Sequence, residues 1–490
     1  MNIRKNMVGV AVLAAGQSGL VLADSEESFA APTIVADMPA SGSGFAHGGS
    51  VAAAADIVVV GRPFDGGSDS DGGAVDVFRR VATDATLEGV PWEWVFWCRL
   101  QPDVPMAGSR FGNSVAVDGM RVVVGGWSDD RVDVNAGAAW VFDIPETAQD
   151  VVVSTAMLVP SEQIAGDYFG WDVDIDGDVI AVGSWGVDVT EEGDHAGAVW
   201  VFEKEGADFV VSQQLTADDA MAGDRFGSAI NIEGDEIFVG APHRSDESGS
   251  VYSFHKGQTG WNQVQRIDSP EGHANEHFGS ALKRVVGTGE GLGGLAVGAP
   301  GDGELGPLAG AAWAFPALGG GLFDTEESIK ILVDGGGPWD RAGSSITGFE
   351  TDHQDEGGGE GIVLLGVPGW RNPSNGAVEG AVFAGVIDEG QTEEEGSFRL
   401  ELISADGGSL GTDVAVVQSS VPEWGFKTLT FVAGAPGRLG GLGAATLVDL
   451  PNAFRDGDCN GDGRFDPMEV LFDPAAHDCD GDGQHDACQL

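Results

Sequence analysis

The sequence predicts an all-β protein built as a seven-bladed β-propeller of four-stranded blades. Three observations lead to this prediction: a repeated apolar motif, an excess of glycine, and an N-terminal strand that can complete the last blade. Glycine supplies 79 of the 490 residues, whereas it makes up about 7% of ordinary proteins. Short alternating runs bounded by glycine and aspartate predict strands, and no long segment with a helical period competes with them.

The repeated motif is an apolar run that ends in Gly-x-Pro or Gly-x-Trp. Its copies are Val58–Pro63, Val122–Trp127, Ile180–Trp185, Ile237–Pro242, Leu295–Pro300, Leu364–Pro368 and Phe431–Pro436. The copies follow one another at roughly 60 residues, and such regular self-similarity indicates a repeat architecture.

Each copy has recurring neighbours that supply the other strands of a unit. A Phe-Gly pair opens a short strand upstream, at Phe111, Phe169, Phe226 and Phe278. An alternating strand that ends in phenylalanine follows downstream, at Gly137–Phe142, Gly197–Phe202 and Gly249–Phe254. A fourth strand then leads into the next unit, as in Val210–Thr216. Four short antiparallel strands per radial repeat make a propeller blade; a solenoid is the alternative and needs polar caps.

The two ends of the chain indicate how the ring closes. The seventh unit ends with its third strand, Ala444–Leu450, and Ile34–Ala40 resembles Leu215–Met221, which precedes the first strand of a unit. We therefore expect the N-terminal strand to complete the last blade, which removes two exposed sheet edges.

These motifs resemble the FG-GAP repeat family, which forms the propeller of integrin α-subunits and of many bacterial secreted proteins. The resemblance covers residues 33–450 and is clear in units two to four. Some family members carry a calcium loop within a blade, but the corresponding turns at 117–120, 176–178 and 233–235 hold too few acids for six or seven oxygen ligands. They are expected to be plain hairpin turns, and 352–356 is the nearest approach to such a loop.

Residues 456–490 form an acidic tail in which two segments match a calcium-binding loop pattern. The expected Ca²⁺ ligands are Asp458, Asn460, Asp462, Arg464 (through its carbonyl), Asp466 and Glu469 in the first loop, and Asp478, Asp480, Asp482, Gln484 and Asp486 in the second. The pair resembles EF-hand-like loops of the dockerin and thrombospondin type 3 kinds, so binding and folding of the tail should coincide. A merely solubilising tail is the alternative.

The cysteines divide between this tail and the propeller. Cys479 could form a disulfide with Cys488, and Cys459 would then have no cysteine partner in the tail. Cys98 lies in an apolar strand and is expected to be a buried thiol, although a bridge to Cys459 is possible.

Residues 1–23 have the basic and apolar regions of a signal peptide, with an exposed lead-in at 24–32, so we expect a secreted protein, whether extracellular, cell-surface or periplasmic. No other apolar run is long enough to span a membrane. The net charge of −54 excludes nucleic acid as a partner. Lys204, Lys256, Lys283, Lys330 and Lys427 are the only lysines after residue 23, and this composition suggests adaptation to salty surroundings.

Catalytic motifs are weak. Gly407–Gly411 has the Gly-x-Ser-x-Gly pattern, but a strand rather than a helix should follow it. His273 and His277 fall in a loop, and no cluster of basic, histidine and tyrosine residues is apparent. Trp140, Trp200 and Trp313 fit blade packing.

We therefore expect a non-enzymatic binding protein of the adhesion type, whose partner is an extracellular protein or glycan. The tail would serve as a docking or spacer module. The alternatives are an enzyme that degrades extracellular polysaccharide and a structural component of a surface matrix.

Overall fold

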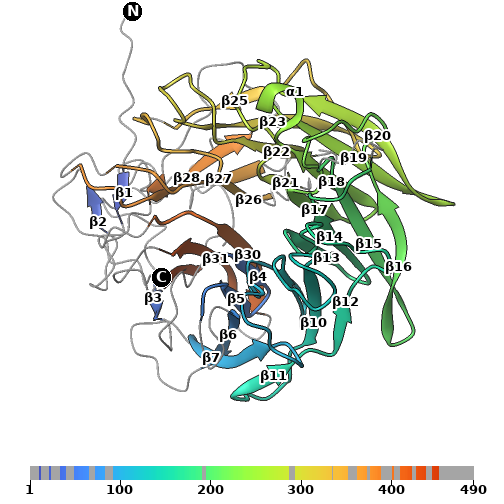
Figure 1. Cartoon of the computed structure of the whole chain (residues 1–490). Helices are drawn as coiled ribbons and strands as arrows, with labels where there is room; N and C mark the ends of the chain where they lie inside the picture. The colour runs from blue at the N-terminus through green and yellow to red at the C-terminus, as the bar shows by residue number, and fades with distance from the viewer. Residues whose placement is uncertain are drawn as a thin grey trace, which may run out of the picture.

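The computed structural model shows a ring of antiparallel sheets (Figure 1). It describes residues 10–12, 21–23, 34–39, 49–65, 72–82, 92–189, 195–285, 293–333, 335–350, 361–371, 376–387, 400–401, 409–421, 426–436 and 444–451. Within these ranges the protein is all-β apart from one short turn of helix, so the predicted fold class is confirmed.

The first blade contains β4 (Val51–Ala54), β5 (Ile57–Arg62), β6 (Ala74–Ala82) and β7 (Trp92–Gln101), with β11 (Val151–Val153) added beside β7. The second contains β8 (Ser114–Asp118), β9 (Arg121–Gly126), β10 (Ala138–Asp143) and β12 (Ala156–Leu158). The third contains β13 (Val173–Asp176), β14 (Val179–Ser184), β15 (Ala198–Glu205) and β16 (Asp208–Leu215). The fourth contains β17 (Ala229–Glu233), β18 (Glu236–Ala241), β19 (Ser250–Gly257) and β20 (Gly260–Asp268), and α1 (Arg244–Glu247) joins β18 to β19.

The fifth blade contains β21 (Leu282–Val285), β22 (Gly294–Ala299), β23 (Ala311–Gly319), β24 (Leu322–Phe323) and β25 (Ile329–Ile331). A three-stranded sheet follows, with β26 (Ser345–Glu350), β27 (Gly361–Val367) and β28 (Ala381–Ile387). The last blade contains β30 (Val414–Val421), β31 (Phe426–Ala435), β32 (Ala444–Pro451) and β3 (Ile34–Pro39). A separate small sheet joins β1 (Val10–Val12), β2 (Val21–Ala23) and β29 (Leu400–Glu401), and its first two strands lie in the predicted signal segment.

The prediction of seven four-stranded blades is wrong. Among the described residues, six blades have four strands or more, and the β26–β28 sheet has three. The sequence that follows β28, residues 388–399, is rich in glutamate and glycine, and strands disfavour both residue types. The next described strand, β29, pairs with β1, so among the described residues the β26–β28 sheet keeps three strands.

The ring closes through the N-terminal strand, as predicted. β3 pairs antiparallel with β32, with Ile34 opposite Asp449 and Pro39 opposite Ala444. The innermost strands contact one another in the order β4, β8, β13, β17, β21, β26, β30 and back to β4. They lie around the centre of the ring in Figure 1.

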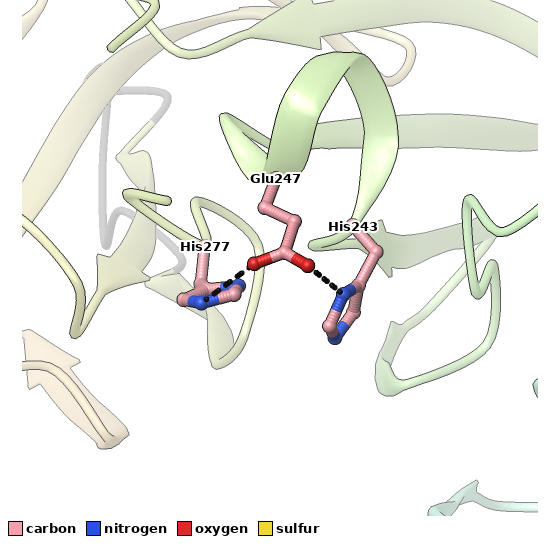
Figure 2. A group of neighbouring side chains, drawn as sticks. All are labelled: His243, Glu247 and His277. Atoms are coloured by element: carbon pink, nitrogen blue, oxygen red, sulfur yellow. Dashed lines mark ion pairs between the residues drawn. The ribbon is translucent and has the colours of Figure 1, made fainter. Parts of the chain in front are cut away.

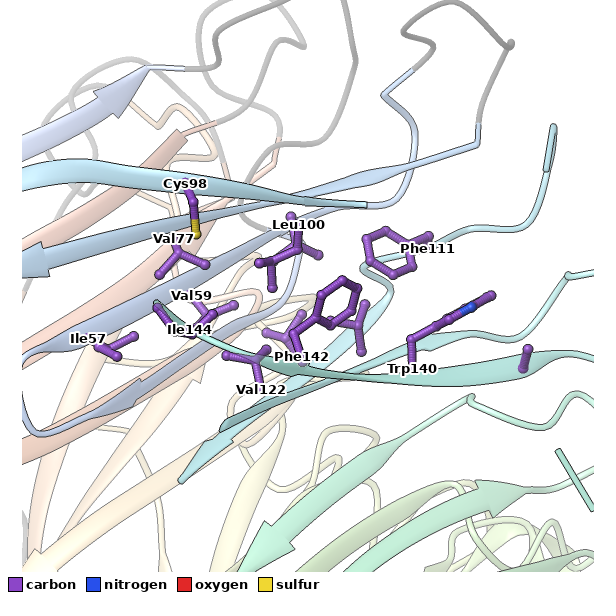
Figure 3. Packing of buried hydrophobic residues seen from close by; sticks show 14 residues of the cluster. Ile57, Val59, Val77, Cys98, Leu100, Phe111, Val122, Trp140, Phe142 and Ile144 are labelled. Atoms are coloured by element: carbon purple, nitrogen blue, oxygen red, sulfur yellow. The ribbon is translucent and has the colours of Figure 1, made fainter. Parts of the chain in front are cut away.

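The core lies between neighbouring blades rather than at the centre of the ring. Between the first two blades, Val77 and Leu100 pack with Phe111, Trp140 and Phe142 in one buried cluster (Figure 3). Equivalent clusters join the later blades. Burying apolar surface contributes roughly 25 cal/mol per Å², so these clusters hold adjacent sheets together.

Several local predictions are confirmed within this core. Trp140 and Trp313 are buried in blade packing, and Trp200 is half-buried against the cluster between the second and third blades. Cys98 is a buried free thiol, and burial raises its pKa to about 12.

The hairpin turns between the first two strands of a blade are also as predicted. Asp118 pairs with Arg121 and Asp176 with Val179 across two-residue turns. Gly119 has a φ of 54°, which the left-handed position of such a turn favours. The expected calcium ligands of the tail and residues 352–356 lie outside the described residues.

Candidate functional site

The Phe-Gly segments clamp neighbouring blades together at one face of the ring. Between the third and fourth blades, the Phe226 N–H donates to the Ala196 carbonyl (2.9 Å) and the Arg225 N–H donates to the His195 carbonyl (3.2 Å). Gly197 forms a parallel bridge with Phe226. A Cβ on Gly197 would lie 2.0 Å from the Phe226 carbonyl oxygen, so only glycine allows this approach.

The same backbone contact recurs at successive junctions. We call its members the junction pairs: Asn135 with Tyr168 (3.1 Å), His195 with Arg225 (3.2 Å), Glu247 with His277 (2.9 Å) and Leu308 with Arg341 (3.0 Å). All eight residues have a positive φ between 51° and 64°, a conformation that side chains other than glycine rarely adopt. The repeat thus imposes an unusual backbone on residues whose identity differs from junction to junction.

Aromatic side chains gather beside two of these junctions. Tyr168 stacks on Trp185 with ring centroids 4.3 Å apart. Trp171 meets Trp185 edge-on at 5.5 Å, and Trp127 lies 5.7 Å from both Tyr168 and Trp171. All four rings are partly exposed. The two Gly-x-Trp motifs and one Phe-Gly segment therefore form a continuous aromatic surface.

A line of basic side chains continues this surface toward the fifth blade. His195 lies 5.5 Å from Trp185, and the Arg225 guanidinium lies 4.7 Å from the Trp185 ring centroid. Arg225 Nη1 is 3.0 Å from His243 Nε2, which fits a hydrogen bond donated by the arginine. The His243 ring in turn lies 5.1 Å from that of His277.

The line ends in a group of two histidines and one glutamate. The Glu247 carboxylate lies between the two imidazole rings (Figure 2), with Oε1 3.5 Å from His243 Nδ1 and Oε2 3.5 Å from His277 Nε2. Burial lowers the pKa of His243 below its ordinary value, and the neighbouring Arg225 and His277 add to this effect. These surroundings therefore favour the neutral form of the His243 ring.

The turn that carries Glu247 is left-handed. Inside α1, Ser245 and Asp246 have φ values of 54° and 58°. The buried Arg244 anchors the turn through Asp224 (2.6 Å) and Asp219 (2.8 Å). We call the whole assembly the loop-face cluster; its members are Trp127, Tyr168, Trp171, Trp185, His195, Arg225, His243, Glu247 and His277.

Comparison with known families decides what the repeats are. The FG-GAP repeat matches residues 94–142, 152–202 and 209–254. The chain contains FG-GAP repeats. A search among curated proteins finds no match. The three FG-GAP matches run from β7 to β19 and cover eight of the nine members of the loop-face cluster, all except His277.

One expectation from the sequence is wrong. The sequence indicates no cluster of basic, histidine and tyrosine residues, but the folded propeller contains one. The structure brings Tyr168 and His195 of one FG-GAP match, Arg225 and His243 of the next, and His277 of the following blade together. The signal that could have found them is positional, because Tyr168, Arg225 and His277 each directly precede a Phe-Gly pair.

Two other sequence motifs behave as expected. His273 and His277 lie in the loop that enters the fifth blade; His273 is exposed, and His277 faces His243 instead. Ser409 of the Gly-x-Ser-x-Gly pattern is followed by strand β30, so the chain has no nucleophile elbow here.

No helix among the described residues is long and apolar enough to cross a membrane. The expected calcium ligands, from Asp458 to Asp486, lie outside the part of the chain that the structure describes.

Proposed function

We propose that this FG-GAP propeller is a secreted, non-enzymatic binding protein of the adhesion type, and that its loop-face cluster binds an extracellular glycan. The observation that carries the proposal is the set of four touching, partly exposed aromatic rings at Trp127, Tyr168, Trp171 and Trp185. Tryptophan and tyrosine dominate binding hot spots because they bury large area at small entropic cost.

Charge narrows the class of glycan. A chain with a net charge of −54 repels anionic polymers at long range. The polar members of the cluster nearest the rings, His195 and Arg225, supply donors for hydroxyl groups. A neutral oligosaccharide, stacked on the rings and hydrogen-bonded at their edge, fits this surface better than an acidic one.

The test is an array of neutral and acidic glycans, followed by calorimetry with the best binder. We expect Trp185→Ala and Trp171→Ala each to weaken binding by about 2 kcal/mol, or about 30-fold. Trp339→Ala is the matched control, because Trp339 is an exposed tryptophan (56%) outside the cluster. Unchanged affinity in both cluster variants would refute this surface as the binding site. If the chain bound proteins but no glycan, the proposed ligand would be a protein and not a glycan.

A second candidate is an enzyme that acts on extracellular polysaccharide, and the gathering of Tyr168, His195, Arg225 and His243 favours it. Tyrosine and histidine are proton-transfer groups, and arginine can hold a carboxylate or a hydroxyl. The experiment is incubation with neutral and uronate-containing polysaccharides, with product chain length as the readout. Depolymerisation that Tyr168→Phe or His243→Gln abolishes would establish the enzyme, whereas unchanged chain length would exclude it.

We also propose that the acidic tail binds Ca²⁺ and acts as a docking or spacer module. The support is chemical: carboxylate and amide oxygens recur at the spacing of calcium-binding loops. We expect dissociation constants of about 10⁻⁴–10⁻³ M, as in other extracellular modules. Calorimetry should show that the Asp458→Asn/Asp478→Asn variant loses this binding; full retention would contradict the assignment.

A further inference from the structure

We propose that His243, Glu247 and His277 form a binding site for a divalent transition metal such as Zn²⁺, at the junction of the fourth and fifth blades. The site is distinct from the calcium loops predicted in the tail. It does not depend on glycan binding, so each proposal can fail without the other.

The ligand chemistry and the spacing both fit. Two imidazoles and one carboxylate are a common set for zinc and related metals. Zinc–ligand distances of about 2.0–2.2 Å place neighbouring ligand atoms of a tetrahedral site roughly 3.4 Å apart. Both His–Glu separations are 3.5 Å, and one ligand atom from each of the three residues lies within 4.8 Å of the others. Only a small closing movement is needed.

The backbone preorganises this group. The His277 N–H donates to the Glu247 carbonyl (2.9 Å), which fixes two ligands side by side as a junction pair. The other three junction pairs combine asparagine with tyrosine, histidine with arginine, and leucine with arginine, so none offers the same chemistry. His243 follows Pro242 at the end of a repeated motif and completes the set from the same blade as Glu247.

Access to solvent also fits a metal site. The three side chains are 24%, 44% and 26% exposed for His243, Glu247 and His277. Three protein ligands at a partly exposed position leave a fourth coordination position open to water or another molecule. A bound metal would thus face the same side of the ring as the aromatic rings.

A neighbouring cluster of acidic and histidine side chains differs from the proposed metal site. Glu271, His273 and Glu276 also lie close together. However, the Lys330 ammonium already binds the Glu271 carboxylate (2.7 Å), and Glu276 is buried. A protein cation therefore occupies that position, whereas the ion pairs of the Glu247 carboxylate among the described residues are with the two imidazoles.

Arg225 links the metal site to the aromatic surface. Because Arg225 donates to His243 Nε2, the neutral ring carries its proton on Nδ1, toward Glu247. A metal on Nδ1 requires this nitrogen to lose its proton and Nε2 to take one up, so the charge of the ring is unchanged. The protonated Nε2 can then no longer accept a hydrogen bond from Arg225, so the guanidinium must move away from His243. The same guanidinium lies over the Trp185 ring. Metal binding is therefore expected to change the environment of Trp185.

The test is calorimetric titration of Zn²⁺ into the full chain in excess Ca²⁺, which keeps the predicted carboxylate loops occupied. Wild-type protein should show one Zn²⁺ that His277→Gln and Glu247→Gln each weaken at least about 100-fold, because loss of a mere second-shell partner costs 10–100-fold. His255→Gln, at a partly buried histidine on β19 outside the group, is the matched control and should bind as wild type does.

Two further readouts separate a metal site from a structural role. Co²⁺ in place of Zn²⁺ should give a visible absorption band in the wild type and in His255→Gln, and neither ligand variant should show it. Arg225→Gln should bind Zn²⁺ more tightly than wild type and should lose the tryptophan fluorescence change on metal addition. Equal stoichiometry and affinity in wild type and in both folded ligand variants would overturn the proposal.

Discussion

The Asp172 carboxylate in the third blade accepts a hydrogen bond from the Ile230 backbone N–H in the fourth (2.7 Å). Asp172 directly precedes β13 and Ile230 lies in β17, and carboxylate contacts of this kind occur again between these two blades and at the ring closure. Asp174 accepts from the Ile232 N–H (2.7 Å), and Asp413 accepts from Val51 across the ring closure (2.7 Å). Neighbouring inner strands are not paired as one sheet, so these carboxylates connect their backbones instead.

These carboxylates make the stability of the ring depend on pH. Burial raises the pKa of Asp172 to about 7 and that of Asp413 to about 6, whereas an unfolded aspartate titrates near 3.9. The folded chain therefore binds these protons more tightly, and their contribution to stability is lost as the pH rises through 7. Between pH 5 and pH 8, the free energy of unfolding of Asp172→Asn should therefore fall by about 2 kcal/mol less than that of wild type.

Urea unfolding at both pH values measures this difference. Asp208→Asn provides the control, because Asp208 is exposed on the outer strand β16. Parallel pH profiles for wild type and Asp172→Asn would show that the inner carboxylate does not titrate as proposed.

Glycine at the Gly-x-Trp motif allows two blades to approach each other. A Cβ on Gly183 would lie 2.2 Å from the Gly227 carbonyl oxygen of the next blade. Gly227 directly follows the buried Phe226, so its backbone cannot withdraw without disturbing that side chain, and we expect Gly183→Ala to lower the free energy of unfolding by at least about 2 kcal/mol. Gly303→Ala, whose Cβ would lie 4.0 Å from the Gly306 carbonyl oxygen, should change the free energy of unfolding little. Equal melting temperatures for the two variants would contradict this reading of the motif.

Much of the fold follows from the repeat because each unit encodes the same four strands. The N-terminal strand was predictable since Ile34–Ala40 resembles Leu215–Met221, and β3 indeed pairs with β32. The sixth unit was not, because the strand that follows β28 in the chain, β29, pairs with β1 and does not extend the β26–β28 sheet. Spacing alone cannot show which neighbour a strand will pair with.

The candidate site was less predictable than the fold. Its aromatic and basic members occupy equivalent positions in different units, so they lie far apart in sequence and close only when the ring forms. Tyr168, Arg225 and His277 each precede a phenylalanine, and the sequence alone does not show that this position takes a left-handed backbone and faces the next blade. Glycines such as Gly119 occupy hairpin turns, whereas Gly183 and Gly197 allow close contacts between blades.

The first blade contains a buried ion-pair group whose members should contribute to stability jointly and not independently. Arg62 contacts Asp65 (2.7 Å) and Asp76 (3.2 Å), and all three side chains are buried. After Arg62→Leu, Asp76 keeps Arg99 (2.8 Å) but Asp65 has that arginine only at 3.9 Å, and we expect a loss of about 3 kcal/mol. Thermal and urea unfolding should show partial recovery in Arg62→Leu/Asp65→Leu. A double variant as unstable as the sum of both single losses would mean that the residues act independently.

The acidity of the surface predicts stabilisation by salt. The chain carries a net charge of −54, and like charges even meet across a hairpin, where Glu205 lies opposite Asp208 in the β15–β16 register. Screening at 1 M salt shortens the Debye length to about 3 Å, so repulsion weakens and the melting temperature should rise relative to low salt. Glu205→Lys converts the facing pair into an attractive one and should add about 0.5 kcal/mol at low salt. Its benefit should largely vanish at 1 M NaCl, whereas a general salting-out effect would raise wild type and variant equally. A wild-type melting temperature that does not increase with salt would contradict the adaptation, because self-repulsion would then not limit the stability of this propeller.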